Sequence, residues 1–234
     1  MRFFTLVSVA FTALPAIACT ETVDSSDVKT SGVYADMSVV ASGNGSSEVS
    51  VGLKVGGSNS NTYLVMKNGD NLTAAIGTDT KTLSKNSNFY KTTFPVEAAD
   101  TAFVVSFNRP DDTTAPNSTM TLPAPFTIAG IAAGDVVSRA TGFAATWTAN
   151  TDGDQMHWTL DGDCFFRKDQ AMADTGSATI GLADFDVHQG DEATTCNASF
   201  CVDRTRNGVL DPAFGEGGII DSAQHRCVAF SSAP

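Results

Sequence analysis

Short runs in which apolar and polar residues alternate recur at roughly ten-residue spacing along this chain. In residues 49–55 the odd-numbered positions are Val or Leu, and the even-numbered positions are Ser, Gly and Lys. A period of two is typical of a strand with one buried face. No segment keeps an i, i+3, i+4 apolar stripe for three turns, as an amphipathic helix would. The pattern therefore predicts an all-β fold of antiparallel sheets.

The extended runs fall into two groups. The first group consists of residues 34–39, 49–55, 62–66, 72–76, 88–94 and 102–107, and Gly43–Ser46 supplies the turn between its first two runs. The second group consists of residues 126–128, 143–147, 156–160 and 198–202. Pro116, Pro123 and Pro125 lie between the groups and cannot serve in a central strand. We therefore predict two antiparallel Ig-like β-sandwich domains in series, over residues 31–112 and 126–231, joined by a Pro-rich linker over 113–125. Trp147 and Trp158 are expected in the second core.

The N-terminus has the features of an export signal. Arg2 is positively charged, and the apolar stretch Phe3–Leu14 is shorter than the roughly 20 residues that span a bilayer. Ala16–Cys19 resembles a lipobox, in which small residues precede the cysteine that takes diacylglycerol. We therefore expect residues 1–18 to be a lipoprotein signal peptide and Cys19 to be the lipidation site. The alternative is an ordinary secretory peptide cut near Ala18, with Cys19 a plain thiol.

Residues 19–30 are polar and acidic and show no apolar periodicity, so they are expected to form a disordered tether. A lipid anchor would then hold the protein at a membrane. Thr20, rather than Asp, follows the cysteine, which favours the outer membrane or the cell surface. The apolar runs after Leu14 are too short for a second membrane span.

Composition limits the partners of the chain. The formal net charge is −12, so nucleic acid and anionic lipid should repel it, and we expect no nucleic-acid partner. An apolar content of 42% is sufficient for real hydrophobic cores. No cofactor is expected.

A set of turn and strand signatures carries a family resemblance: Ala115–Ser118, Leu122–Phe126, Trp158–Cys164, Asp174–Gly176, Arg204–Gly208, Asp211–Gly218 and Gln224–Arg226. Their order resembles a group of uncharacterised lipoproteins with Ig-like β-sandwich domains from myxobacteria and related Gram-negative bacteria. The resemblance covers most of residues 31–231. It implies a location and a fold, and it implies no activity.

Catalytic and zinc sites find little support in the sequence. The three histidines, His157, His188 and His225, are accompanied by no Gly-x-Ser-x-Gly motif, so we assign no catalytic residue. Cys196 and Cys201 with His188 are a poor fit to zinc-ligand spacing, so we assign no metal ligands.

Charged clusters have two interpretations each. The acidic loops offer oxygen ligands that suit calcium, namely Asp152, Asp154, Asp161, Asp163, Asp184, Asp186, Asp191 and Glu192. The EF-hand spacing is absent and Asp-Gly also marks hairpin turns, so turns are preferred and calcium stays an alternative. Arg204, Arg206 and Arg226 fit either a small anion site or surface pairing with Asp and Glu, of which we prefer the pairing.

Two classes of function remain. The preferred one is a non-enzymatic, membrane-anchored envelope or surface lipoprotein that binds a protein or an envelope polymer, or has a structural role. The alternative is an extracytoplasmic, hydrolase-like enzyme whose site is built from loops. A deep pocket with converging groups of shifted pKa would favour the enzyme.

The four cysteines after Cys19 are expected to form two disulfides in an exported protein. Cys196 and Cys201 lie in one predicted strand, about 16 Å apart, which is too far for a bond. By strand parity, Cys201 and Cys227 both point away from the core, so they can join neighbouring strands. Cys196 and Cys164 lie at strand ends that can meet. We therefore predict the pairs Cys164–Cys196 and Cys201–Cys227.

Overall fold

A computed structural model describes residues 20–234, and the leader with the proposed lipidation site at Cys19 lies outside the described residues. The described chain is all-β, as predicted: it has seventeen strands, and its only helices are three short 3-10 helices. In chain order the elements are β1 (Glu21–Asp24), η1 (Ser25–Asp27), η2 (Thr30–Gly32), β2 (Val33–Ala41), β3 (Ser47–Val55), β4 (Thr62–Val65), β5 (Asn71–Ile76), β6 (Asp79–Thr82), β7 (Ser84–Asn86), β8 (Phe89–Phe94), β9 (Ala102–Asn108), β10 (Ala115–Thr121), β11 (Val136–Ser138), β12 (Phe143–Thr146), β13 (Gln155–Gly162), β14 (Phe165–Met172), β15 (Ser177–Ile180), η3 (Leu182–Asp184), β16 (Cys196–Asn207) and β17 (Gly218–Ala233).

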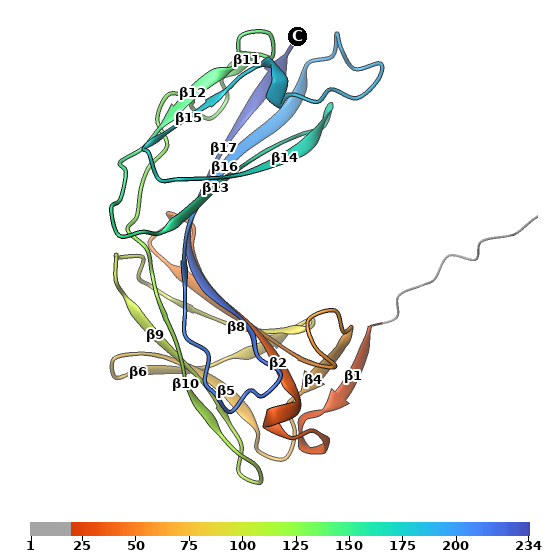
Figure 1. Cartoon of the computed structure of the whole chain (residues 1–234), viewed down its shortest axis with the longest axis vertical. Coiled ribbons are helices and arrows are strands. Elements are labelled where there is room, and N and C mark those ends of the chain that lie inside the picture. The colour runs from red at the N-terminus through yellow and green to blue at the C-terminus, as the bar shows by residue number, and fades with distance from the viewer. Residues whose placement is uncertain (1–19) are drawn as a thin grey trace, which may run out of the picture.

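One large sheet runs through the whole molecule. It has eleven strands, with the path β1-β4-β3-β2-β17-β16-β13-β14, and β7, β8 and β11 pair beside this path. A four-stranded sheet, β10-β9-β5-β6, and a two-stranded sheet, β12-β15, complete the fold. The molecule is curved, and the large sheet lines its concave side while the two small sheets lie on the convex side (Figure 1).

The last strand, β17, belongs to both halves of the molecule. Its first seven residues pair in parallel with β2, from Gly218 opposite Ala35 to Gln224 opposite Ala41. Along its length it also pairs antiparallel with β16, and its end pairs in parallel with β11. The large sheet is therefore continuous across the two halves.

Two hydrophobic cores lie between the large sheet and the small ones. The first forms where alternate residues of β2 and β3, such as Val39 and Val51, meet residues of β5, β9 and β10, such as Phe103 and Phe107. The second is rich in aromatic side chains and includes Trp158, Phe200 and Phe230. Trp147 and Trp158 are both buried there, which confirms their predicted place. Each half is thus a β-sandwich with its own core.

The predicted domain boundaries need correction. Residues 113–125 were expected to be a linker, but β10 is a strand of the first sandwich, and Leu122 is buried in its core. The second domain was expected to hold everything from 126 to 231, but Phe214 and Ile220 pack in the first core. Phe214 stacks on Phe107, with ring centroids 6.2 Å apart. The chain therefore returns to the first sandwich after β16 and leaves it again along β17.

The expected tether is also ordered over its described part. Residues 21–24 form β1, which pairs in parallel with β4. Arg109 then holds the next turns through its guanidinium, which donates to Ser25 O at 2.6 Å and to Val28 O at 2.8 Å. Asp70 and Asp112 neutralise this buried arginine at 3.1 and 2.7 Å. Polar composition was a poor guide here because the partners lie about 80 residues away in sequence.

The two sandwiches are joined by side chains as well as by strands. Arg206 binds Asp100 of the first half and Asp154 of the second, both at 2.7 Å, and the hydrogen bonds to Asp154 and Asp100 raise its pKa. Gln224 donates to the carbonyls of Glu97 and Pro123 at 2.9 and 3.1 Å. These bonds connect the two halves at their junction.

The predicted arginine pairing is partly corrected. Arg204 lies in the interior, where it pairs with Asp174 at 2.8 Å and donates to Ala124 O at 2.7 Å. Arg226 donates to Ala41 O and Phe126 O, at 2.9 and 3.0 Å. The arginines do meet acidic and carbonyl oxygens, but they do so at the junction and not on a free strand surface.

Candidate functional site

Three neighbouring strands of the second sandwich place His157, Asp203 and His225 side by side. Asp203 of β16 lies directly opposite His157 of β13 and His225 of β17 in the strand registers. The residues before and after Asp203, Val202 and Arg204, are buried, so the alternation of the strand turns Asp203 to the other face. That face is the side of the large sheet away from the cores, on the concave side of the molecule (Figure 1).

The Asp203 carboxylate bridges the two imidazoles. Its Oδ1 lies 2.6 Å from His225 Nδ1, and its Oδ2 lies 3.2 Å from His157 Nε2. The hydrogen bond that His225 donates to Asp203 raises the pKa of His225, against the opposing effects of burial and of the Arg226 charge. About a third of the His225 side chain, 36%, remains exposed, so the imidazole ring stays in contact with water.

The Cys201–Cys227 disulfide adjoins this pair, as predicted by strand parity. The two cysteines are directly opposite each other on β16 and β17. His225 Nε2 lies 3.0 Å from the Cys227 sulfur. Asp203, His225 and Cys227 thus have the order of an acid–base–nucleophile triad. The Cys227 sulfur is bonded to Cys201, however, so it is not a free nucleophile in this state.

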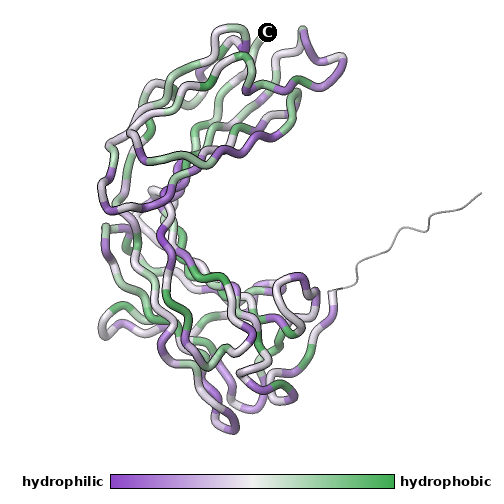
Figure 2. The backbone as a smooth tube through the Cα atoms, viewed as in Figure 1, coloured by the Kyte–Doolittle hydropathy of each residue, from purple (hydrophilic) through white to green (hydrophobic). Residues whose placement is uncertain are grey.

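Further polar side chains continue the cluster toward the edge strand β14. Thr159, which lies opposite Cys201, donates to Asp169 at 2.6 Å. Arg167 binds the same carboxylate at 2.9 Å. These hydrogen bonds, with that from Arg167 the larger, lower the pKa of Asp169 to about 2. In Figure 2 hydrophilic residues follow this edge of the second sandwich. The concave face therefore carries a charged, hydrogen-bonded strip across four strands.

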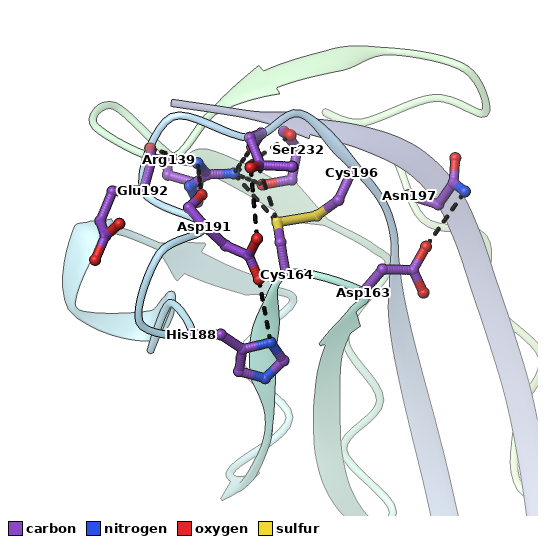
Figure 3. Close-up of a disulfide and its surroundings, with 10 residues drawn as sticks. Arg139, Asp163, Cys164, His188, Asp191, Glu192, Cys196, Asn197 and Ser232 are labelled. Carbon is purple, nitrogen blue, oxygen red and sulfur yellow. Dashed lines mark hydrogen bonds and ion pairs between the residues drawn. A yellow bond between two sulfur atoms is a disulfide. The ribbon is translucent and has the colours of Figure 1, made fainter.

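The second predicted disulfide, Cys164–Cys196, lies beside the Arg139 guanidinium (Figure 3). Cys164 is buried, and the buried Arg139 donates to its sulfur at 3.4 Å. The same guanidinium donates to Thr194 O and Glu192 O, both at 3.0 Å. Arg139 therefore fastens the loop before β16 to the disulfide, and both predicted pairings are present.

Several carboxylates of the acidic loops bind other side chains of the same chain. Asp154 binds Arg206, Asp184 binds Lys168 at 2.7 Å, and Asp163 accepts from Asn197 at 3.3 Å. Within residues 20–234, the carboxylates of these loops do not converge with each other as a set of three ligand atoms. Cys196 and Cys201 belong to different disulfides, so neither sulfur is a free thiolate ligand in this state.

A hollow of about 430 Å³ lies in the first sandwich, beside Arg109. Its lining includes Asp70 and Asp112, which already bind that arginine. Its charged groups are thus committed to holding the N-terminal segment. The histidine cluster is on a different sandwich, on an open strand face.

The cluster of His157, Asp203 and His225 was missed in the sequence. The predicted Cys201–Cys227 bond could have revealed this cluster, because such a bond fixes the register of the two strands. With those cysteines opposite each other on antiparallel strands, the residues two positions away on each strand, Asp203 and His225, must also be opposite each other.

None of the helices in residues 20–234 has the length and apolar character required to cross a membrane. No protein-family model and no curated protein sequence matches the chain. Among solved structures, it is similar to the fibronectin(III)-like modules of CbhA from Clostridium thermocellum, with 12% sequence identity and a TM-score of 0.26. The alignment covers 86% of this chain and 90% of the other. A similarity at this level does not assign a function.

Proposed function

We propose that this protein is an exported, lipid-anchored envelope or surface protein that binds a partner across its concave face and performs no catalysis itself. Its two sandwiches serve as Ig-like modules, and Cys19 carries the anchor at the outer membrane or cell surface. The partner is a protein or an envelope polymer that presents positive charge. The two disulfides support export, because such bonds persist in oxidising compartments.

The observation that carries this proposal is the continuity of the large sheet. β17 pairs with β2 in the first sandwich and continues beside β16 into the second, so the concave face is one continuous sheet surface. Arg206 and Gln224 hold the two halves at the junction. A rigid face binds at a lower entropic cost than two domains on a flexible linker.

The positive charge of the partner follows from the groups on this face. Asp36 of β2 and Asp221 of β17 lie on adjacent strands, two residues apart in register, since Asp221 is opposite Ser38. Burial, followed by the charge of Asp36, raises the pKa of Asp221. Two carboxylates that destabilise each other's charge gain free energy when a cationic group binds between them. The net charge of −12 also attracts a basic partner over distance.

The binding proposal is tested by capture from envelope extract with residues 20–234. The variant Asp36→Asn/Asp221→Asn should lose most of the captured partner, and capture should fall with added salt. Asp79→Asn is the matched control, because Asp79 is an exposed carboxylate on β6, on the opposite side of the first sandwich. Equal capture by all three proteins would refute a role for the concave carboxylates.

The anchor is tested separately by detergent-phase partitioning of the full chain. The wild-type protein should enter the detergent-rich phase, and Cys19→Ala should move it to the aqueous phase, because the acyl chains provide the membrane affinity. A wild-type protein that already partitions into water would show that Cys19 is not lipidated.

A further inference from the structure

The Cys201–Cys227 disulfide is more open to solvent on its Cys227 side. Cys227 is exposed, whereas Cys201 is partly buried among its neighbours on β16. Exchange of a disulfide begins when a thiolate attacks one of the two sulfurs, and access decides which sulfur is attacked. An incoming thiolate therefore meets Cys227 first, and Cys201 becomes the first leaving group.

The exposed sulfur also has an imidazole in contact. His225 Nε2 lies 3.0 Å from Cys227 Sγ, and its Nδ1 lies 2.6 Å from Asp203 Oδ1. The Asp203 carboxylate fixes the ring with Nε2 directed at the sulfur. His157 binds the other carboxylate oxygen at 3.2 Å, which holds Asp203 from the opposite side.

We propose that Cys201–Cys227 is a redox-active disulfide that accepts two electrons from a dithiol, with Cys227 as the sulfur that exchanges. One thiolate of the dithiol attacks Cys227 Sγ, the Cys201–Cys227 bond breaks, and the Cys201 sulfur leaves and takes up a proton. In the mixed disulfide, one sulfur of the dithiol is bonded to Cys227. The second thiolate of the dithiol then attacks that sulfur, and Cys227 leaves as a thiolate. The dithiol is oxidised to a disulfide, and Cys201 and Cys227 are reduced.

His225 favours the second step by electrostatics. The Asp203 hydrogen bond raises the pKa of His225, so more of the imidazole is protonated near neutral pH. A protonated imidazole beside a thiol stabilises the thiolate and lowers the pKa of that thiol. A stabilised thiolate leaves faster, and it makes the disulfide easier to reduce because the reduced form is favoured. Cys227 is the sulfur at hydrogen-bond distance from the imidazole, 3.0 Å, although the Cys201 sulfur also lies within 4.8 Å of the ring.

The proposal is tested on residues 20–234 in buffers of reduced and oxidised dithiothreitol. Alkylation followed by peptide mass spectrometry reports the state of each cysteine. Cys201–Cys227 should be reduced at a more oxidising potential than Cys164–Cys196, while the protein stays folded. In the reduced protein at pH 6, Cys227 should alkylate roughly tenfold faster than a thiol of ordinary pKa.

Two substitutions separate this role from a structural one. His225→Gln should remove the fast alkylation of Cys227, and Asp203→Asn should shift its pH profile toward higher pH. His188→Gln is the matched control, because His188 lies in the loop beside the other disulfide, where its backbone N–H donates to Cys164 O. This control should leave the profile unchanged.

The proposal is overturned if both disulfides are reduced only together with unfolding, or if Cys227 alkylates with an ordinary thiol profile. It is also overturned if His225→Gln and Asp203→Asn, both folded, alkylate like the wild type. Partner capture is measured without reductant, so failure of the redox proposal and failure of the binding proposal give different results.

Discussion

The disulfides Cys164–Cys196 and Cys201–Cys227 cross-link the same sandwich over similar sequence separations, 32 and 26 residues, but their surroundings differ. Cys164 is buried, and the Arg139 guanidinium joins it to the carbonyls of a loop. Cys227 is exposed and contacts an imidazole held by a carboxylate. The bond is the same in both places. The neighbours decide whether it serves as a permanent cross-link or as a group that can react.

The largest expected effect comes from removing each bond. Loop entropy predicts about 3.5 kcal/mol of lost stability for either pair, because the closed loops are similar in length. Cys164→Ala/Cys196→Ala should cost about 1 kcal/mol more, since Arg139 also loses a partner. Cys201→Ala/Cys227→Ala should show the loop effect alone. Urea unfolding of the two oxidised variants measures the difference, and a larger loss at Cys201–Cys227 would reverse the comparison.

A smaller effect is expected from the arginine beside the buried bond. Arg139→Met should cost about 1–3 kcal/mol, because it leaves the carbonyls of Glu192 and Thr194 without their donor. It should also make the loop before β16 sensitive to protease. Arg167→Met is the control: Arg167 pairs with Asp169 on the surface, so its loss should leave the stability nearly unchanged. Equal losses for the two variants would show that Arg139 does not fasten the loop.

The smallest effect is the pH dependence of the exposed site. The Asp203 hydrogen bond raises the pKa of His225 in the folded state. The stability it provides is therefore fully present below the ordinary pKa of histidine, near 6.5, and is lost as pH rises through the raised value. Asp203→Asn should remove this decline above about pH 6.5, and thermal unfolding of both proteins over a pH series measures it. A decline that persists in the variant would assign it to other groups.

The parts of the fold that could be predicted rest on local patterns. The alternation in residues 34–39 and 49–55 indicates β2 and β3, because a buried face repeats every two residues. The same parity, applied to the positions of the cysteines in their strands, predicts the Cys201–Cys227 pair and leaves Cys164 for Cys196. The pairing of Asp203 with His225 could have been predicted from the same argument, because a cross-strand disulfide fixes the register of the residues beside it.

The parts that could not be predicted depend on distant contacts. The parallel pairing of β2 with β17 joins residues about 180 positions apart, and a parallel neighbour leaves no turn signal in the sequence. The order of the N-terminal segment depends on Arg109, whose hydrogen bonds offset the polar composition of residues 21–30. Hydrogen-bond partners at such distances are set by topology, not by composition.

The pairing of β2 with β17 also determines how the molecule bears load. The two strands run parallel, so a force that pulls the start of β2 away from the end of β17 slides one strand along the other. The seven residue pairs between Gly218 and Gln224 then carry the load together and must break together, unlike an antiparallel hairpin that opens one pair at a time. A protein held at its N-terminal side and pulled through its second sandwich would therefore resist extension at this seam.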